Sequence, residues 1–475
     1  MSRLVVISNR LPLGSNPSGG LVVALHDTMK ERGGLWVGVE PGENAGGAQP
    51  RFVEHPGLSF ERKALEIPEE LYDAYYLGYA NSVLWPLCHG RIDLLDLQPH
   101  YRQGYIEVNR RLARTLAEEL APDDIIWVHD YHLFPLAQML RSEGVLNPIG
   151  FFLHIPFPSA ANIGALTDVT ELAGWLAAFD LVGLQTNRDV AACLEVFRTL
   201  PGSEMLMDGA IRYRSRMVDV KSFPIGIDAR QFAEIAASRS QRHEPTGSIG
   251  ELIIGADRLD YSKGLPQRFR AYADLLEHHS EWRGKVSYLQ IASPTRENVE
   301  AYRDIREELE QLSGAINGRF ADIGYTPLQY IHRPVERDRL AGLFRRSRVG
   351  LVTPLADGMN LVAKEYVAAQ DPADPGVLVL SCFAGAAEQL GDAVLLANPY
   401  DTRQMSQRIH EALAMPLDER RQRHQAAIEN IVDEDVNWWA ATFIKALQAK
   451  SVGSDFLDLL RKLPRSQTLT AVEQA

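Results

Sequence analysis

The sequence predicts an α/β protein in which helices cover both faces of two parallel, doubly wound sheets. Three observations support this fold class. Short, uniformly apolar runs rich in β-branched residues recur along the whole chain, as parallel strands buried on both faces require. Stretches with helical periodicity separate many of these runs. Each half of the chain also begins with such a run, Leu4–Ile7 in the first half and Leu252–Ile254 in the second.

The expected strands are only a few residues long and almost uninterrupted in their apolar composition. They are Leu4–Ile7, Ile125–Val128, Ile149–Leu153, Leu181–Leu184, Leu252–Ile254, Tyr288–Ile291, Val349–Val352, Val377–Leu380 and Val394–Leu396. The expected helices between them include Leu112–Leu120, Ala191–Leu200 and Gln267–His278. Strands that alternate with helices in this way build βαβ units, so the sheets are expected to be parallel.

A chain of 475 residues is too long for one ordinary hydrophobic core, and two or three domains are expected. The first boundary is expected between Pro224–Asp228 and the stretch Ser238–Ser248, which is rich in charge and in helix breakers. We therefore expect two Rossmann-like domains, residues 1–228 and residues 229–433, that face each other.

Hydrophobic residues make up 45% and charged residues 23% of the chain, as in a globular protein. The net charge of −13 argues against a nucleic-acid partner, so local Arg and Lys must attract any phosphate-bearing substrate. Cys88, Cys193 and Cys382 form no CxxC pair, which indicates a reduced, cytoplasmic protein without disulfides or structural zinc. The first apolar run is too short for a secretion signal, and no apolar run reaches about 18 residues, so no membrane segment is expected.

Polar or turn-forming residues follow many of the expected strands. These endings are Ser8–Arg10, His129–His132, His154–Pro158, Gln185–Arg188, Asp257–Asp260 and Pro294–Arg296. In open parallel sheets, ligands bind outside the carboxyl ends of the strands, near a point where the strand order reverses. The sequence therefore predicts a ligand cleft between the two domains that is lined from both sides.

The segment from Asp357 to Glu365 carries the most information about that cleft, because it directly follows the apolar run Val349–Val352. Gly358 allows the backbone to turn closely, and Asn360 can cap the helix that follows. The first N–H groups of that helix suit a phosphate or a sugar hydroxyl. The carboxylates of Asp357 and Glu365 suit the hydroxyls of a sugar and a ribose. The alternative is an ordinary βα turn whose acids only cap and solvate it.

A second segment has Arg258 and Lys263 five residues apart, just after an expected strand. Arg provides a planar fork and Lys a compact charge, and together they suit a diphosphate leaving group. The alternative is a surface loop in which Arg258 pairs with Asp257 or Asp260. The occurrence of this segment together with the capped helix start at Asp357–Glu365 favours the phosphate-binding interpretation.

These two segments, DRLDYSKG and DGMNLVAKEY, resemble those of the trehalose-6-phosphate synthases, a family of retaining glycosyltransferases with the GT-B fold. Further motifs of the same family occur in the same order: SNR followed by SGGL, NSVLWP, HDYHL, FFLHIPFP and PGVLVLSCFAGAA. The resemblance extends from Arg3 to about Trp439, and the set of motifs is far more specific than any one of them.

The resemblance implies an enzyme that moves glucose from UDP-glucose to glucose 6-phosphate with retention of the α configuration. The products would be α,α-trehalose 6-phosphate and UDP, and trehalose synthesis would fit a role in osmotic or desiccation stress. The GT-B fold implies two Rossmann-like domains that face each other across a cleft, and a C-terminal helix, residues 434–461, that crosses back to the first domain. The polar tail, residues 462–475, is expected to be disordered.

On the donor side, the resemblance implies catalytic roles for four residues. Arg258 and Lys263 would hold the UDP diphosphate, Asp357 would bind glucose hydroxyls, and His154 would lie at the reaction centre near the donor sugar. The other implied donor-binding positions are Gly19 and Gly20, in a flexible loop after the first strand, and Leu361, Val362, Ala363, Lys364 and Glu365. Backbone groups of this last run would serve the nucleotide, and the Glu365 carboxylate would meet the ribose.

On the acceptor side, Arg10 and Arg296 would clamp the 6-phosphate, while Tyr76, Trp85 and Asp130 would position the second glucose. An Arg pair can select a phosphorylated sugar over glucose itself. Trp85 would offer a flat apolar wall to a sugar ring, although a core Trp is the alternative.

The chain departs from the family pattern in two places. The glycine loop between Arg10 and Gly19 is shorter than in well-known bacterial members, so its closure is expected to differ. Val335 stands where relatives use a Phe against the uracil. A backbone contact at Val335 would preserve recognition of the base, but UDP-, ADP- and GDP-glucose all stay open as donors.

The residues themselves nominate neither a base for an inverting reaction nor a carboxylate nucleophile for double displacement. The resemblance implies front-face substitution, in which a phosphate oxygen of the leaving group accepts the proton of the acceptor. No cofactor and no metal are expected, because His129, His132 and His154 are not accompanied by an HExxH or Cys/His set. Relatives form dimers or tetramers, so a homo-oligomer without nucleic-acid or membrane partners is expected.

Three other functions stay open. A glucosylglycerol-phosphate synthase would use glycerol 3-phosphate, but Tyr76 and Trp85 suit a sugar ring as acceptor. A nicotinamide-dependent oxidoreductase would need a GxGxxG after the first strand, and the sequence has none there. An inert sugar-phosphate sensor is disfavoured because Arg258, Lys263 and the two carboxylates of the helix-start segment are intact.

Overall fold

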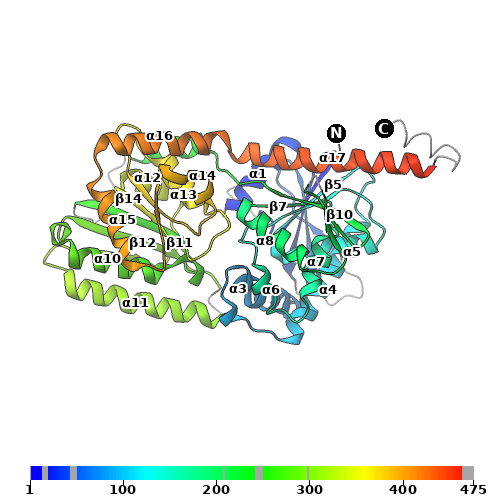
Figure 1. Ribbon diagram of the computed structural model, residues 1–475, viewed down its shortest axis with the longest axis horizontal. Helices are drawn as coiled ribbons and strands as arrows, with labels where there is room; N and C mark the ends of the chain where they lie inside the picture. The colour runs from blue at the N-terminus through cyan, green and yellow to red at the C-terminus, as the bar shows by residue number, and fades with distance from the viewer. Residues whose placement is uncertain are drawn as a thin grey trace.

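The computed structural model describes residues 2–12, 20–42, 51–206, 209–240, 250–296 and 299–462. Within these residues the chain forms two α/β parts that lie side by side, each built on one sheet (Figure 1). Gly19, most of the polar stretch (residues 241–249) and the C-terminal tail from residue 463 lie outside the described residues.

The first part contains a ten-stranded sheet with a parallel centre. In spatial order its strands are β3 (Phe52–Glu54), β4 (Glu61–Ile67), β2 (Leu35–Pro41), β1 (Leu4–Ile7), β5 (Ile125–His129), β6 (Ile149–Phe152), β7 (Leu181–Leu184), β10 (Arg216–Ser222), β9 (Ile211–Tyr213) and β8 (Ser203–Met205). β3 is antiparallel to β4 at one edge, and β8 and β9 form an antiparallel hairpin at the other. The chain starts in the middle, at β1, which pairs with β2 on one side and β5 on the other.

The second part contains a six-stranded sheet in which every neighbouring pair is parallel. Its order is β13 (Leu328–Ile331), β12 (Val286–Ser293), β11 (Glu251–Arg258), β14 (Val349–Val352), β15 (Val377–Ser381) and β16 (Leu395–Ala397). β11 begins this sheet and pairs with β12 on one side and β14 on the other. The strand order therefore reverses at β1/β5 in the first sheet and at β11/β14 in the second.

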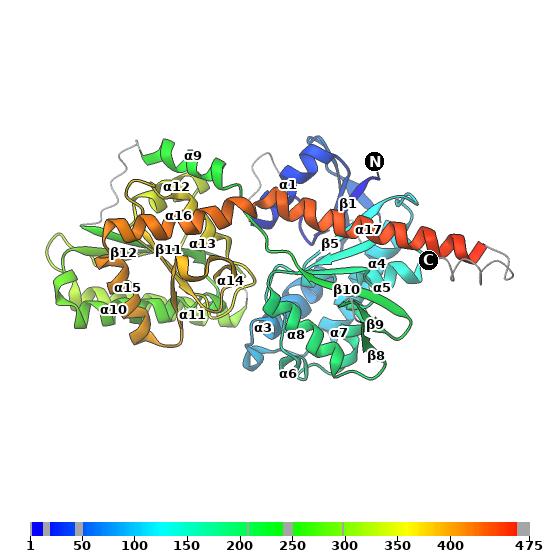
Figure 2. The same ribbon diagram turned by 45° about the horizontal axis from the view of Figure 1, so that its top comes forward.

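Helices cover both faces of each sheet. In the first part they are α1 (Gly20–Arg32), α2 (Glu69–Asp73), the π-helix Ala74–Leu84, α3 (Trp85–Cys88), α4 (Pro99–Ala117), α5 (Leu136–Ser142), α6 (Ala160–Ile163), α7 (Val169–Leu176) and α8 (Asn187–Arg198). In the second part they are α9 (Ala229–Ser240), α10 (Leu265–His278), α11 (Glu300–Phe320), α12 (Arg337–Arg346), α13 (Leu361–Ala369), α14 (Ala386–Leu390), α15 (Thr402–Ala414) and α16 (Leu417–Asp433). Figure 2 shows α9, α12, α13 and α16 on one side of the second sheet and α10, α11 and α15 on the other.

Two chain segments connect the parts and touch each other. The first follows β10 and contains Gly226, and the second joins α16 to the last helix, α17 (Val436–Lys462). A Cβ atom on Gly226 would lie 2.2 Å from the carbonyl oxygen of Glu434, so only a glycine fits between the two crossings.

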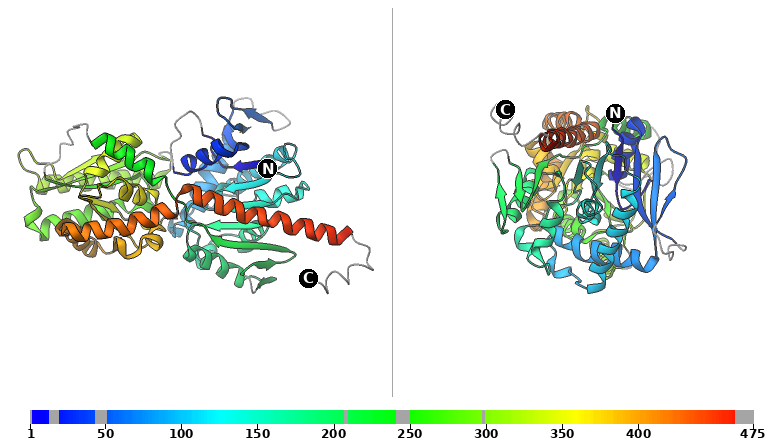
Figure 3. Two further views of the ribbon diagram at one scale, coloured as in Figure 1. Left: turned by 90° about the horizontal axis from the view of Figure 1, so that it is seen from above. Right: turned by 90° about the vertical axis from the view of Figure 1, so that its right-hand side faces the viewer.

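Helix α17 packs on the first sheet although it follows the second part in the sequence (Figures 1 and 3). The fully buried Trp439 has its ring 4.9 Å from that of Trp127 on β5. Phe443 stacks on the same Trp127 ring and fills the space above Gly183, where a Cβ atom would lie 2.6 Å from the Phe443 ring. The apolar face of the first sheet is therefore completed by the last helix of the chain.

The expected α/β class with parallel sheets is confirmed. Each expected strand coincides with an observed one, whereas β2, β4, β10, β13 and the short strands β3, β8 and β9 were not predicted. Among the described helices, none combines the length and the hydropathy that a membrane span requires.

Candidate active site

A cleft of about 450 Å³ lies between the two parts. Its walls carry residues that follow β1, β5 and β6 on one side and β11 and β14 on the other, so both points of strand-order reversal open into it. Most of the site residues expected from the sequence line it: Arg10, Tyr76, Trp85, Asp130, His154, Arg258, Lys263, Arg296, Asp357, Leu361, Val362 and Glu365.

A second hollow of about 560 Å³ lies outside this cleft, between the π-helix and the start of α11. Its described lining includes Glu70, Asp73, Glu300 and Asp304 but neither Arg nor Lys. Because a phosphate needs local positive charge in this acidic protein, the smaller cleft is the candidate site.

The two cations at the end of β11 stand in different surroundings. The exposed guanidinium of Arg258 lies 5.3 Å from the centre of the Trp85 ring. The buried Lys263 sits in a short 3-10 turn, and its Nζ lies 2.6 Å from Oδ2 of Asp357. Gly264, at φ +66°, closes this turn where a Cβ atom would lie 2.4 Å from the carbonyl oxygen of Thr353. Arg258, at the end of β11, and Lys263, in the turn that follows, thus both line the cleft.

The segment after β14 forms the expected turn and capped helix. Asn360, at φ +74°, accepts a hydrogen bond from the N–H of Ala363 through its side chain and caps α13. Burial alone would raise the pKa of Asp357, but the neighbouring Lys263 ammonium and the Asn360 amide keep it below its usual value. The Asp357 carboxylate is therefore ionised while Lys263 is its partner.

Gly358 brings this turn into contact with the opposite wall. A Cβ atom on Gly358 would lie 2.2 Å from the carbonyl oxygen of His154, and one on Gly385 would lie 1.8 Å from the carbonyl oxygen of Gly358. The turn is thus in close contact with both the second sheet's own loop and the His154 segment of the first part.

Along α13 the side chains diverge. Glu365 lines the cleft, where burial raises the pKa of its carboxyl and an ion pair with Arg337 at 3.5 Å opposes that rise. Lys364 points the other way: its Nζ is fully buried and donates to the carbonyl oxygen of Ile225, 2.7 Å away in the first crossing segment. Helix α13 therefore directs Glu365 into the cleft and Lys364 toward the segment that connects the two parts.

Four expected donor residues do not line the cleft in the described part of the chain. Ala363 and Lys364 are buried behind the α13 N-terminus, and Val335 packs against the core of the second part. Gly20 is the first residue of helix α1 rather than part of a loop, and Gly19 lies outside the described residues. The loop expectation for Gly20 is therefore corrected, because the helix begins earlier than the glycine content of the segment suggests.

Two histidines form a pair at the floor of the cleft. Nδ1 of His129 and Nε2 of His154 lie 3.1 Å apart, so one ring donates its proton to the other. Burial lowers the pKa of both imidazoles, that of His154 to about 3. Both rings are neutral at pH 7, which suits orientation of a ligand by hydrogen bonds better than transfer of a proton.

Asp130 stands between the two parallel strands β5 and β6 with an unusual backbone. Its φ is +75°, a region that costs a non-glycine residue free energy. The N–H of Asp130 donates to the carbonyl of Phe152, and its Oδ1 accepts from the N–H of His154 at 3.3 Å. Hydrogen bonds to the adjacent segment Phe152–His154 therefore hold this backbone conformation. Burial raises the pKa of Asp130 to about 6 despite these hydrogen bonds and the nearby Arg258 and Arg296.

Arg10 and Tyr76 meet at the open side of the first wall. Nη2 of Arg10 donates to the hydroxyl of Tyr76 at 3.0 Å, and its guanidinium lies 5.2 Å from the ring centre. Arg10 is exposed, so its remaining N–H groups are available to a ligand. The Tyr76 ring is stacked in turn on His132, at 5.7 Å between ring centroids.

Trp85 lies under two guanidinium groups of the opposite part. It is 3% exposed, and Arg296 lies 4.0 Å above its ring. Arg296 also donates to the hydroxyls of Tyr131 at 3.1 Å and Tyr302 at 2.6 Å. This arrangement links the first part to the second through the candidate acceptor residues.

Sequence reasoning missed the network that holds Arg296. Asp260 is fully buried and accepts from Tyr302 at 3.0 Å; burial would raise its pKa, but Arg296, Lys263 and Arg258 bring it to about 2. Tyr131 and Tyr302 are the other members. Tyr131 and Asp260 stand at strand ends that the sequence had marked, whereas nothing in the sequence points to Tyr302, which lies in helix α11.

Comparison with known proteins gives the family of this chain. The model of "Glycosyltransferase family 20" matches residues 10–449. A trehalose-6-phosphate synthase of Sodalis glossinidius is 44% identical over 454 residues, which are 94% of this chain and 96% of that protein.

Solved structures agree with this result. An α,α-trehalose-phosphate synthase (UDP-forming) of Burkholderia xenovorans, in complex with glucose-6-phosphate, superposes with a TM-score of 0.88 at 45% identity and covers 94% of this chain and 100% of its own. An E. coli protein bound with UDP-2-fluoro glucose has a TM-score of 0.88 at 43% identity, over 94% of this chain and 99% of its own. The expected GT-B fold is thereby confirmed. On this match over nearly its whole length, the chain belongs to glycosyltransferase family 20.

Proposed function

We propose that the protein transfers glucose from UDP-glucose to glucose 6-phosphate and releases α,α-trehalose 6-phosphate and UDP. The observation that carries the proposal is a single cleft with cationic groups for two phosphorylated ligands, Arg258 and Lys263 on the second part and Arg10 on the first. The similar proteins support it, because one was solved with glucose-6-phosphate and another with a fluorinated UDP-glucose.

Donor binding rearranges one ion pair. Without a ligand, Lys263 and Asp357 neutralise each other at 2.6 Å. The donor brings both a diphosphate for Lys263 and glucose hydroxyls for Asp357, so each partner exchanges one strong interaction for another. Arg258 then completes a two-cation clamp, with its planar fork on the diphosphate.

The nucleoside lies over the N-terminus of α13 in this proposal. Leu361 and Val362 line the cleft in the first turn of the helix, where N–H groups have no partner within the helix, and the Glu365 carboxylate accepts from the ribose hydroxyls. Ala363 and Lys364 contribute backbone only. The base is met by backbone near Val335, and Gly19 and Gly20 offer backbone N–H groups to the donor.

The acceptor binds against the first part. Arg10 and Arg296 take the 6-phosphate, and the sugar ring lies beside Trp85, Tyr76 and Asp130, which all line the cleft. Each charge-assisted hydrogen bond contributes about 1.5–3 kcal/mol, enough for the arginines to select the phosphorylated sugar over glucose.

The chemistry proposed is front-face substitution with retention. The bond from the anomeric carbon to the diphosphate oxygen breaks, the acceptor hydroxyl attacks on the same side, and a phosphate oxygen accepts its proton. Arg258 and Lys263 stabilise the negative charge that develops on the departing diphosphate, the contribution that usually dominates. The neutral pair of His154 and His129 orients the donor sugar, since an imidazole with a pKa of about 3 is a poor base.

The deciding experiment measures UDP release from UDP-glucose with glucose 6-phosphate, with glycerol 3-phosphate or without an acceptor, and without added metal. Turnover only with glucose 6-phosphate, and an α,α-linked product by NMR, is the expected result. An Arg258→Ala variant should lose turnover, whereas Arg303→Ala, on the exposed face of α11, serves as the matched control.

Glycerol 3-phosphate is the second candidate acceptor, because the same arginines would bind its phosphate. Turnover with glycerol 3-phosphate alone would identify the protein as a glucosylglycerol-phosphate synthase instead. Binding of UDP without turnover for any acceptor, with ADP- and GDP-glucose also tried, would identify an inert sensor instead.

In the same proposal, each of the two domains binds one of the two substrates. Residues 1–228, together with the helix expected at 434–461, form the acceptor domain, and residues 229–433 form the donor domain. The protein acts in the cytoplasm as a homo-oligomer, a dimer or tetramer, with small molecules as its substrates and without a cofactor. Light scattering coupled to size-exclusion chromatography measures the assembly, and a monomeric mass would overturn it.

A further inference from the structure

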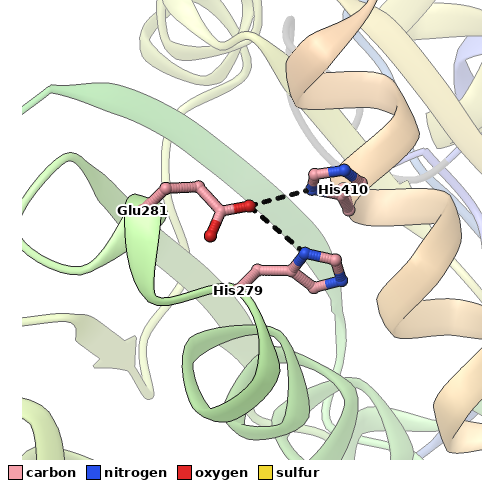
Figure 4. A group of neighbouring side chains, drawn as sticks. All are labelled: His279, Glu281 and His410. Atoms are coloured by element: carbon pink, nitrogen blue, oxygen red, sulfur yellow. Dashed lines mark hydrogen bonds and ion pairs between the residues drawn. The ribbon is translucent and has the colours of Figure 1, made fainter.

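Three potential ligand side chains meet on the outer surface of the second part, far from the cleft. His279 and Glu281 follow the C-terminus of α10, and His410 lies on α15, which packs beside it (Figure 4). All three side chains are partly exposed, between 27% and 53%. Helix α10 starts next to Lys263 and ends here, so its 14 residues put about 20 Å between this cluster and the candidate active site.

The donor atoms of this cluster are spaced as metal ligands are. Oε1 of Glu281 lies 3.3 Å from Nδ1 of His279 and 3.8 Å from Nδ1 of His410. One possible ligand atom from each of the three side chains lies within 4.8 Å of the other two. Two ligands bound tetrahedrally to one zinc ion, each at about 2.0–2.1 Å, are about 3.4 Å apart. The cluster is therefore close to the required spacing before any ion enters.

The proton positions leave an unrelieved contact in this cluster. The indole N–H of Trp282 donates to Nδ1 of His410 at 3.0 Å, so that nitrogen carries a lone pair and the neutral ring has its proton on Nε2. Oε1 of Glu281 lies 3.8 Å from the same nitrogen with no proton between them. A cation bound to both atoms would relieve this contact.

We propose that His279, Glu281 and His410 form a binding site for one divalent transition-metal ion, with Zn²⁺ as the best fit. Two imidazole nitrogens and one carboxylate oxygen suit zinc, nickel or copper, whereas magnesium and calcium prefer oxygen ligands alone. Water completes the coordination, because three side chains leave at least one position open.

Binding requires a small rearrangement that can be observed. The two imidazole rings are stacked, 3.9 Å apart and 16° from parallel. A metal ion binds in the plane of an imidazole ring, so two nearly parallel rings cannot both ligate it, and His279 has to turn out of the stack. His279 follows the end of a helix and is partly exposed, which leaves it room to turn. The ion also displaces the Trp282 N–H from His410.

The site joins two elements that pack against each other and that the Trp282–His410 hydrogen bond already connects. His279 and Glu281 precede β12, while His410 belongs to α15, so the bound ion would cross-link the far end of α10 to its neighbouring helix. This role concerns stability of the second part and leaves the glucosyl transfer reaction independent of the metal.

The test is isothermal titration of metal-free protein with ZnCl₂. One site is expected, and His410→Ala should weaken binding at least tenfold, since it removes one of three protein ligands. Trp282→Phe should tighten binding several-fold, because it removes the donor that competes for Nδ1. His278→Ala is the matched control, since its Nδ1 faces Asp274 instead, 3.1 Å away, and it should bind Zn²⁺ as the unaltered protein does.

Two further measurements make the outcome decisive. Zn²⁺ should raise the melting temperature of the unaltered protein and of His278→Ala but not that of His410→Ala, while all three turn over substrate equally without metal. Zinc binding that His410→Ala leaves unchanged, the absence of a binding heat, or equal binding of MgCl₂ at this site would each overturn the proposal.

Discussion

Replacing Lys364 with Met tests whether a buried ammonium ties the donor-binding helix to the crossing between the two parts. The Lys364 side chain is fully buried and donates to the carbonyl of Ile225 at 2.7 Å. Burial lowers its pKa from 10.5 to about 7, although the Glu434 carboxylate acts in the opposite direction. Met has a similar length and apolar stem, so the substitution removes the charge and the hydrogen bond but little volume.

The size of the expected change in the free energy of unfolding with pH follows from the difference in protons bound by the folded and unfolded chains. Because folding lowers the pKa of Lys364, the unfolded chain binds more protons than the folded chain between pH 7 and about 10, and the free energy of unfolding rises with pH in that window. For a drop from 10.5 to about 7, the gain between pH 7 and pH 9 is about 2 kcal/mol. The Lys364→Met variant lacks this gain.

At pH 7 itself the substitution has two opposing effects on stability. The variant leaves the Ile225 carbonyl without its donor, which costs about 1–3 kcal/mol, but it also removes a lysine whose charged form is disfavoured by burial. The informative quantity is therefore the change with pH rather than the stability at one pH.

Urea unfolding at pH 7 and pH 9, followed by tryptophan fluorescence, measures the difference between the two proteins. That difference should grow by about 2 kcal/mol toward pH 9 in favour of Lys364. Lys285→Met, at an exposed lysine of the same domain, should show no such growth. A difference that is the same at both pH values would mean that Lys364 titrates as an exposed lysine does, and the reasoning would fail.

Four further predictions concern the cleft. Arg296→Ala should raise the KM for glucose 6-phosphate roughly 10- to 150-fold and that for UDP-glucose far less, and equal losses in steady-state kinetics would contradict the acceptor assignment. Gly358→Ala should abolish turnover while circular dichroism stays unchanged, because its Cβ would lie 2.2 Å from the His154 carbonyl oxygen; full activity would show that the turn can shift. The pKa of Asp130, raised to about 6, predicts that kcat/KM falls as pH drops through 6 and the carboxylate is protonated, and an Asp130→Asn variant that keeps this decline would exclude Asp130 as its cause. UDP plus glucose 6-phosphate should compact the protein, and small-angle scattering that stays the same at saturation would count against domain closure.

The sequence predicts the parallel strands well because their burial on both faces leaves an unmistakable apolar run. Val349–Val352 and Leu181–Leu184 are examples in which every residue is buried. It misses β4, Glu61–Ile67, because half of that strand is charged and its pattern does not differ from that of a surface segment. Short antiparallel edge strands such as β8 are set by their partners rather than by their own composition.

For the candidate site, the sequence predicts residues that stand directly at strand ends, because the topology of a parallel sheet brings those ends together. It does not predict directions within a helix. Glu365 and Lys364 are neighbours in one motif, yet one faces the cleft and the other the crossing segment. It also cannot reveal the Arg296–Tyr302 hydrogen bond, which depends on how α11 is docked.

The packing of α17 on the first sheet has a consequence for how the chain is made. All strands of that sheet have been synthesised once Ser222 has been added to the chain, but the helix that covers Trp127 and Gly183 begins only at Val436. At a translation rate of about 5–20 residues per second, roughly 10–40 s pass between the synthesis of Ser222 and that of Val436. Until the last helix is made, one apolar face of the nascent sheet is not covered by it. During that interval it presents a surface to chaperones, and a chain that stops early leaves this surface exposed for good. A finished copy therefore differs from a truncated one in that the last helix covers this face of the sheet.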